Sequence, residues 1–337
     1  MADYRSTFRG RRQRWFGLKP LVKTALAARP LRPALRLAAR TVPGVRAGRL
    51  PAPAGLAEVA GTAAGARFVL VDPARCEIAK EFYWGRGRRP DPADALALDI
   101  VTALARTADV LLDVGAYTGV FTVAAAAANP RLRAHAFEMI PAVVAGLERN
   151  LERNGIAHRV EVHPTGVGAS GMRMRVPSGE GGSALPSFYS ASMEFDDGVE
   201  VVFTALDDLL DGAQGGSLDG GLDGALDGGP AGEHAAAGRE RVVMKIDVEG
   251  AENAVLAHGQ EFLARYRPDI LCEVLHGQAD GRELEALLAP HGYRWYLVRE
   301  HDLAERTRIA PDPVFRDWLF TARTPAELES DLGRIIA

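Results

Sequence analysis

The most constraining feature of this chain is a short apolar segment that leads into a glycine turn, Val110-Leu-Leu-Asp-Val-Gly-Ala-Tyr-Thr-Gly119. Its first residues, Val110 to Leu112, predict a buried strand, and the apolar run from Val120 to Ala128 predicts a buried helix that Asn129-Pro130 ends. A strand that leads through an acid and glycines into a helix is the first unit of a nucleotide-binding α/β domain. The free N–H groups at the start of such a helix can bind an anion.

The spacing of the turn limits which ligand it can hold. A dinucleotide-binding turn reads G-x-G-x-x-G, whereas this one reads D-x-G-x-x-x-G and has Tyr117 at the position of the middle glycine. The difference argues against a pyrophosphate over the turn. It favours a smaller ligand with a carboxylate, such as the methionine end of S-adenosylmethionine.

Strand and helix patterns alternate through the rest of the chain. Continuous apolar strands between amphipathic helices predict a parallel sheet that is covered on both faces. We expect an N-terminal arm and linker at 1–66 and one domain at 67–337. The expected strands are 67–72, 110–112, 135–138, 159–163, 242–246, 269–275, 293–298 and 317–321, with a hairpin formed by 172–176 and 200–204.

Composition places the chain among ordinary globular proteins, with 47% hydrophobic and 25% charged residues. The sequence contains no apolar run near the length of a membrane-spanning helix and no signal-peptide pattern. Cys76 and Cys272 lie in separate segments without metal-ligand spacing, which predicts free thiols in a reducing cytoplasm.

Charge is distributed unevenly along the chain. Residues 1–50 carry 13 Lys/Arg and one acid, Asp3, although the whole chain has a net charge of −4. Arg32, Arg36 and Arg40 recur every four residues beside an apolar stripe. Two interpretations remain open: a solvated tail, or a basic amphipathic helix in weak contact with an anionic membrane surface.

A low-complexity insert occupies residues 212–238, where Leu-Asp-Gly repeats at 218, 222 and 226. It contains too little apolar surface to offset its ordering entropy, so we predict a flexible loop.

Glu138 follows the second strand of the predicted domain, 19 residues after Gly119. A doubly wound domain places an acid there to accept hydrogen bonds from a ribose diol. We therefore predict that Glu138 binds the ribose of the cofactor.

A second group of polar residues, Lys245-Ile-Asp-Val-Glu-Gly-Ala-Glu252, follows the fourth strand at the edge of the sheet where ligands bind. Asp247 and Glu249 are candidate catalytic residues there. Glu273 ends the next strand, and we expect it to pair with Lys245 because a buried carboxylate needs a partner. His276 lies three residues further on and is a candidate base, since its pKa suits proton transfer near neutrality.

These motifs together resemble the FkbM family of S-adenosylmethionine-dependent methyltransferases. The resemblance covers about residues 95–322, and the motifs that carry it are Asp113-Val-Gly-Ala-x-x-Gly119, Glu138, Leu206-Asp-Asp-Leu209, Lys245–Glu252 and Pro268…Glu273. It implies a Rossmann-like, seven-stranded class I methyltransferase sheet with an antiparallel last strand at 317–321. The insert and the basic N-terminal extension depart from the family pattern.

The resemblance also implies the chemistry. S-adenosylmethionine would be the cofactor, bound by Asp113, Gly115, Ala116, Gly119 and Glu138. The reaction would be O-methylation of a hydroxyl on a sugar or natural product. We expect a cytoplasmic enzyme with a small-molecule or glycan substrate and no nucleic acid partner.

In the expected mechanism His276 is the base, and Asp247 orients it or holds the acceptor hydroxyl. If His276 is not the base, Asp247 or Glu249 would take that role. We predict no metal, although Asp247, Glu249 and Glu273 could bridge one, because Glu273 is expected to pair with Lys245.

Two other classes of function are disfavoured. An NAD-dependent oxidoreductase does not fit Tyr117 or the absence of any Tyr-x-x-x-Lys pair in the sequence. The intact motif formed by Asp113, Gly115, Gly119 and Glu138 argues against a membrane-associated scaffold that has lost cofactor binding, though not against one that has lost turnover.

Overall fold

The computed structural model describes residues 47–179, 198–211, 240–276 and 280–336, apart from 54 and 334, together with residues 33, 34 and 37. Of the predicted basic helix, residues 33, 34 and 37 are described and are helical. The rest of that helix and the predicted loop at 212–238 lie outside the described residues. No helix within the described part of the chain is long and apolar enough to cross a membrane.

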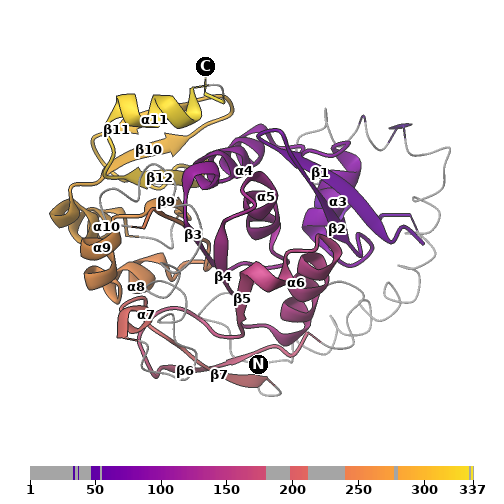
Figure 1. Cartoon of the computed structure of the whole chain (residues 1–337), viewed down its shortest axis with the longest axis horizontal. Helices are drawn as coiled ribbons and strands as arrows, with labels where there is room; N and C mark the ends of the chain where they lie inside the picture. The colour runs from indigo at the N-terminus through magenta and orange to yellow at the C-terminus, as the bar shows by residue number, and fades with distance from the viewer. Residues whose placement is uncertain are drawn as a thin grey trace, which may run out of the picture.

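A mixed sheet forms the centre of the molecule (Figure 1). In spatial order its eight described strands are β11 (Leu303–Arg306), β10 (Arg294–Val298), β12 (Asp317–Thr321), β9 (Asp269–Glu273), β8 (Val242–Ile246), β3 (Val110–Val114), β4 (Arg133–Phe137) and β5 (Val160–His163). The last five of these run parallel. β12 lies between β9 and β10 and is antiparallel to both, which confirms the predicted antiparallel last strand.

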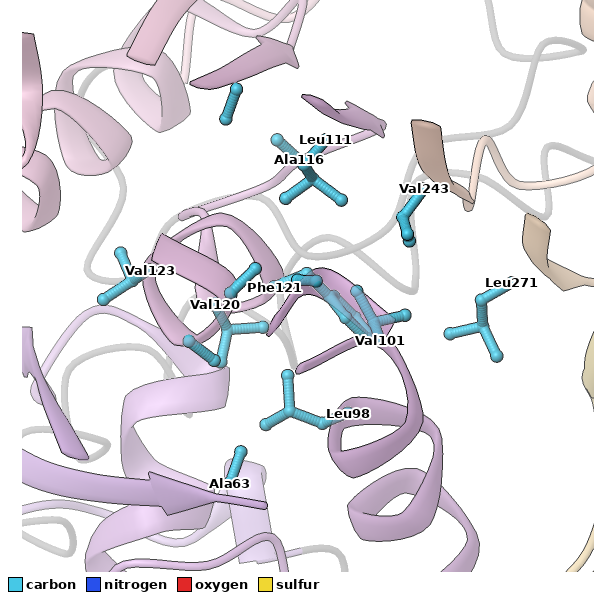
Figure 2. Packing of buried hydrophobic residues seen from close by; sticks show 14 of the residues in the cluster. Ala63, Leu98, Val101, Leu111, Ala116, Val120, Phe121, Val123, Val243 and Leu271 are labelled. Atoms are coloured by element: carbon cyan, nitrogen blue, oxygen red, sulfur yellow. The ribbon is translucent and has the colours of Figure 1, made fainter. Parts of the chain in front are cut away.

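Helices cover both faces of this sheet (Figure 1). One face is covered by α4 (Pro92–Leu104), α5 (Val120–Ala128), α6 (Pro141–Arg153) and α11 (Pro325–Leu332), and the other by α8 (Glu252–Ala257), α9 (Gln260–Tyr266) and α10 (Gly281–Leu288). Side chains alternate between the faces along each strand. Leu111 and Val243 are direct register partners and lie on the face packed by Val101 and Phe121 (Figure 2). Every residue of β3 and β8 is buried, as expected for central parallel strands.

The remaining elements join or flank the sheet. They are β1 (Glu58–Ala63), β2 (Ala66–Val71), α3 (Glu77–Trp84), β6 (Arg173–Val176), β7 (Val199–Val202), α7 (Asp208–Asp211) and the short 3-10 turns Ala47–Arg49, Ala105–Thr107, Ala157–Arg159 and Ala289–His291. β6 and β7 form the predicted antiparallel hairpin.

Two features differ from the sequence-based expectations: the family resemblance implies a seven-stranded sheet, and the pattern after β8 predicts a single helix at 249–258 that Gly259 ends. The eighth strand is β11, a half-exposed strand that pairs antiparallel with β10 and has no continuous apolar run to predict it. The expected helix at 249–258 is instead α8, followed after Gly259 by α9. Glu249 and Gly250 have positive φ and are not helical, and a Cβ at Gly259 would lie 2.7 Å from Leu206. A residue with a side chain would not fit at position 259, where α8 has ended and α9 begins.

The expected domain boundary at residue 66 falls inside a β-hairpin. β1, from the predicted linker, pairs antiparallel with β2 along its whole length. Two asparagines of α6 hold this hairpin. Asn150 Oδ1 accepts from Val71 N at 2.7 Å, and Asn154 both accepts from Val69 N and donates to Val69 O. Residues 58–66 thus pack as part of the main domain.

Candidate functional site

The turn after β3 is held mainly by Asp113, which lies fully inside the protein. One carboxylate oxygen of Asp113 accepts from Thr122 N at 3.1 Å and from Thr122 Oγ1 at 2.6 Å. Burial raises the pKa of Asp113, although Lys245 and the Thr122 contacts oppose the shift. The side chain fixes the start of α5 against β3, so its place in the cofactor motif is explained by support of the turn rather than by direct contact with a ligand.

The glycines of the turn are required by close packing. Gly115 has φ 74°, and a Cβ there would lie 1.9 Å from Asp247 O. Gly119 has φ 77°, and its Cβ would lie 2.3 Å from Leu147 Cδ1. Ala116, between them, is 3% exposed and packs in the core. The turn is therefore pressed between α6 and the segment that follows β8.

The start of α5 offers free backbone donors at this turn. The first amides of a helix have no acceptor within the helix. Asp113 satisfies the amide of Thr122, and Gly119 O satisfies that of Val123. The amides of Val120 and Phe121 are left at the positive end of the helix, where they can bind an anion such as a carboxylate.

Glu138 lies beside the turn, as the sequence predicted, and is 9% exposed. Its two oxygens accept from Tyr117 N at 3.0 Å and from Ile140 N at 2.9 Å. Burial raises the pKa of Glu138 to about 7, against the lowering effect of these amides. Tyr117 has φ 50°, an uncommon conformation for a side chain of its size. Each carboxylate oxygen retains a lone pair for a further donor, so the pair of oxygens fits a ribose diol.

Lys245 links this turn to the segment after β8. Its ammonium, 4% exposed, donates to Gly115 O at 2.6 Å and lies 3.3 Å from Asp247 Oδ2 and 3.8 Å from Asp113 Oδ1. It also lies 5.4 Å from the centre of the Phe121 ring. Burial alone would lower the pKa of Lys245, but the two carboxylates raise it above its usual value, so the ammonium stays charged.

Three carboxylates gather at the ends of β8 and β9. Oxygens of Asp247, Glu249 and Glu273 all lie within 4.8 Å of one another. Burial would raise the pKa of Asp247, but Lys245 lowers it below the usual value. Burial and then the charge of Asp247 raise the pKa of Glu249 to about 7 and that of Glu273 to about 10. At neutral pH the group therefore contains an ionised Asp247, a protonated Glu273 and a Glu249 that can exchange a proton.

Glu249 takes part in this cluster with a strained backbone conformation. Its φ of 55° is unusual for a residue with a side chain, and such conformations cost on the order of 1–3 kcal/mol. Glu252 supports the turn, because its Oε1 accepts from Gly250 N at 3.0 Å and from Val248 N at 3.3 Å. Glu252, buried with 0% exposure, thus has a structural role, whereas Glu249 is partly exposed at the cluster.

The predicted Lys245–Glu273 pair is wrong. In the β8–β9 register Lys245 lies opposite Leu271, whereas in the β3–β8 register it lies opposite Asp113. Glu273 instead contacts Arg316, whose Nε lies 3.1 Å from Glu273 Oε1. The prediction that no metal binds these carboxylates consequently loses its stated reason. The absence of a metal at these carboxylates therefore stays a prediction, and their oxygens are close enough together to hold an ion.

The structure does not bring His276 to the cluster through any contact that it describes. His276 is exposed, and its Nδ1 lies 3.5 Å from Pro311 O.

Sequence reasoning also missed Arg316, whose Nη2 contacts Asp94 at 3.3 Å while its Nε contacts Glu273. The sequence around Arg316 gives no local signal of these contacts, because Asp94 is more than 200 residues away along the chain.

Comparison with known proteins gives a consistent assignment. The family model of the methyltransferase FkbM domain matches residues 113–295, more than half of the 337-residue chain. This range contains the turn, Glu138 and the three carboxylates. No match was found among curated proteins.

Several solved structures are similar at low identity. The methyltransferase FkbM from Methylobacillus flagellatus KT has 18% identity and a TM-score of 0.40, covering 64% of this chain and 44% of that chain. The O-methyltransferase from Bacillus cereus, solved with SAH, has 12% identity and a TM-score of 0.36, covering 66% and 78%. The O-methyltransferase TomG from Streptomyces achromogenes, involved in tomaymycin synthesis and solved with SAM, has 13% identity and a TM-score of 0.36, covering 69% and 79%.

Replacement of Lys245 by methionine should destabilise the protein by about 3–5 kcal/mol, because it leaves Asp113 and Asp247 without their shared cation. Urea unfolding followed by circular dichroism measures the loss. Arg173→Met is the control, since Arg173 and Glu200 form an exposed pair, and its effect should stay below about 1 kcal/mol. Equal losses in the two variants would show that Lys245 does not hold the two segments together.

Proposed function

Because the chain belongs to the FkbM family of S-adenosylmethionine-dependent methyltransferases, we propose that it methylates a hydroxyl oxygen of a small-molecule or glycan acceptor. Membership of this family argues against the oxidoreductase alternative, and measured methyl transfer would exclude the non-catalytic scaffold. The observation that carries the choice of a hydroxyl is the set of three carboxylates with different pKa values at the ends of β8 and β9.

The residues around the turn after β3 fit the cofactor. When bound, S-adenosylmethionine supplies an electrophilic methyl group. Glu138 would hold the ribose through its two oxygens. The amides of Val120 and Phe121 would hold the carboxylate of the methionine end. Gly115 lets the backbone approach Asp247, and Gly119 lets it approach α6. With the backbone in this position, Glu138 and the amides of α5 would face one cofactor site.

Glu249 is the group best suited to take the proton from an acceptor hydroxyl. Its pKa of about 7 is matched to neutral pH, where a base is most effective. Asp247, which stays ionised and whose side chain is 38% exposed, is suited to accept a hydrogen bond from the same hydroxyl and orient it. His276 remains a predicted base without a described contact to either residue.

The charge of the cluster also limits the class of acceptor. An anionic acceptor, such as a carboxylate or a nucleic acid phosphate, would be repelled by Asp247 and by ionised Glu249. A carboxylate is already deprotonated at neutral pH and needs no base. A neutral hydroxyl needs a base and a hydrogen-bond acceptor, and the cluster offers both.

The acceptor atom can be identified from the product. The protein is incubated with methyl-labelled S-adenosylmethionine and neutral sugars or polyhydroxylated natural products, each beside an analogue that carries a carboxylate. We expect label in neutral acceptors, in a methyl ether that resists alkali. Label released by mild alkali would be a methyl ester and would contradict the proposal.

Glu138→Ala should weaken binding of S-adenosylhomocysteine at least about tenfold, because a charge-assisted contact to the ribose is lost. Isothermal titration calorimetry measures the affinity. Wild-type affinity should rise between about pH 6 and about pH 8, since Glu138, with a pKa of about 7, accepts hydrogen bonds best when ionised. Glu152→Ala, an exposed change on α6, is the control. Unchanged affinity in Glu138→Ala would remove Glu138 from the cofactor site.

Glu249→Gln should lower kcat by about 10²-fold or more while cofactor affinity is retained, the scale expected for loss of a base. Wild-type kcat should rise with pH through about 7, as the carboxyl group loses its proton. Glu261→Gln, an exposed acid in the first turn of α9, is the matched control. A fully active Glu249→Gln enzyme together with an inactive His276→Ala enzyme would return the role of base to His276.

We further propose that the protein is a cytoplasmic enzyme whose arm at residues 1–50 makes weak contact with anionic membrane surfaces. The 13 basic residues of the arm, against one acid, support this contact. Cys76 and Cys272 are free and buried, which suits a reducing compartment. Co-sedimentation with phosphatidylserine vesicles should decrease with added salt. It should also weaken about 10²-fold when Arg32, Arg36 and Arg40 become glutamine, at about 1 kcal/mol for each charge. Vesicle binding that is unchanged by added salt and by the three substitutions would contradict this contact.

A further inference from the structure

Two histidines and a glutamate lie together on β4 and β5, and β5 is the last strand at one edge of the sheet, three strands away from β8. His135 of β4 is the direct register partner of Glu161 of β5, and His163 lies two residues further along β5. All three side chains therefore share one face of the sheet. It is the face of Leu112 and not of Asp113, since His135 pairs with Leu112 in the β3–β4 register. The cluster and Asp113 are thus on opposite faces.

The donor atoms of this cluster lie close together, and the two histidines contact different oxygens of Glu161. His135 Nδ1 lies 3.1 Å from His163 Nε2 and 3.5 Å from Glu161 Oε2, and His163 Nε2 lies 3.9 Å from Glu161 Oε1. In a tetrahedral zinc site with Zn–N bonds of about 2.0–2.1 Å, two donor atoms are about 3.3–3.4 Å apart. The two nitrogens lie slightly closer together than this value, and one oxygen of Glu161 must approach both rings for the three donor atoms to bind one ion.

We propose that His135, His163 and Glu161 form a binding site for Zn²⁺ or a similar divalent transition metal. Two imidazoles and one carboxylate are the ligand set of open zinc sites, and imidazole is a poor ligand for Mg²⁺ or Ca²⁺. Among the described residues no fourth side chain joins the group. The Glu161 side chain is 45% exposed, so water or a small ligand can complete the coordination.

The two rings are already oriented by packing. His163 stacks on Phe137 with ring centroids 4.5 Å apart and an angle of 12°, and the two histidine rings are 5.4 Å apart at 28°. Both come from strands in the sheet, so little ordering is needed when a metal binds.

A simpler explanation is a hydrogen bond between two neutral histidines that happens to lie beside a surface glutamate. It accounts for the 3.1 Å contact, in which one ring donates to the other. It gives no reason for the carboxylate to lie within reach of the same nitrogen atoms of both rings. The two explanations differ in whether the folded protein binds a metal through all three side chains.

The test uses the full-length chain without an affinity tag, treated with a chelator and then dialysed. Calorimetric titration with Zn²⁺ should show one site per chain with micromolar or tighter affinity. Co²⁺ should give the visible absorption of a tetrahedral complex. Glu161→Gln should weaken Zn²⁺ binding at least about tenfold, and His163→Asn should do the same through a different ligand.

Three controls make the result specific. His158→Ala removes an exposed histidine near Glu161 and should leave Zn²⁺ affinity unchanged. Glu249→Gln should also leave it unchanged. The thermal transition of each metal-free variant is compared with wild type, so that loss of binding is not confused with loss of folding. No binding by the wild-type protein, or binding that depends on Glu249 and not on Glu161, would overturn the proposal.

Discussion

The buried ammonium of Lys245 is the interaction on which the rest of the candidate site depends. It lies between Asp113, which anchors the turn after β3, and Asp247, which follows β8. Without it, the buried carboxylate of Asp113 would face the partly exposed carboxylate of Asp247 with no cation between them, and like charges so placed are unfavourable. The same ammonium donates to Gly115 O, so one side chain holds both segments at the distance that the glycine backbone allows.

That arrangement explains how one region can present acids in different protonation states. Lys245 keeps Asp247 ionised, and ionised Asp247 then raises the pKa values of Glu249 and Glu273, adding to the effect of burial. Arg316 reaches Glu273 from the segment before β12, the antiparallel strand inserted beside β9. The inserted strand therefore contributes to the chemistry as well as to the sheet.

The two sites that we propose use different parts of the same sheet. The cofactor and acceptor residues follow the carboxyl ends of β3, β4, β8 and β9, where parallel strands leave helix starts and backbone donors free. The histidine cluster lies instead on one face of β4 and β5. Backbone hydrogen bonds connect the two regions, among them Glu138 N to His163 O at 3.1 Å. A metal at the histidines would consequently lie close to the ribose-binding acid without being part of the methyl-transfer site.

Local sequence was sufficient for much of this structure. The boundaries of α5, β8 and β12 were predicted to the residue, because apolar runs and the helix-ending pair Asn129-Pro130 act over a few residues. Glu138 beside the turn was also predicted, since its position follows from the order of strand and helix.

What the sequence could not determine was which side chains meet across strands. The partner of Lys245 depends on strand register, and the contact of Arg316 with Glu273 depends on where β12 enters the sheet. The contact between His135 and His163 depends on the pairing of β4 with β5, which begin 27 residues apart along the chain. Register and strand order are set by the packing of the whole core, so only the tertiary structure decided these contacts.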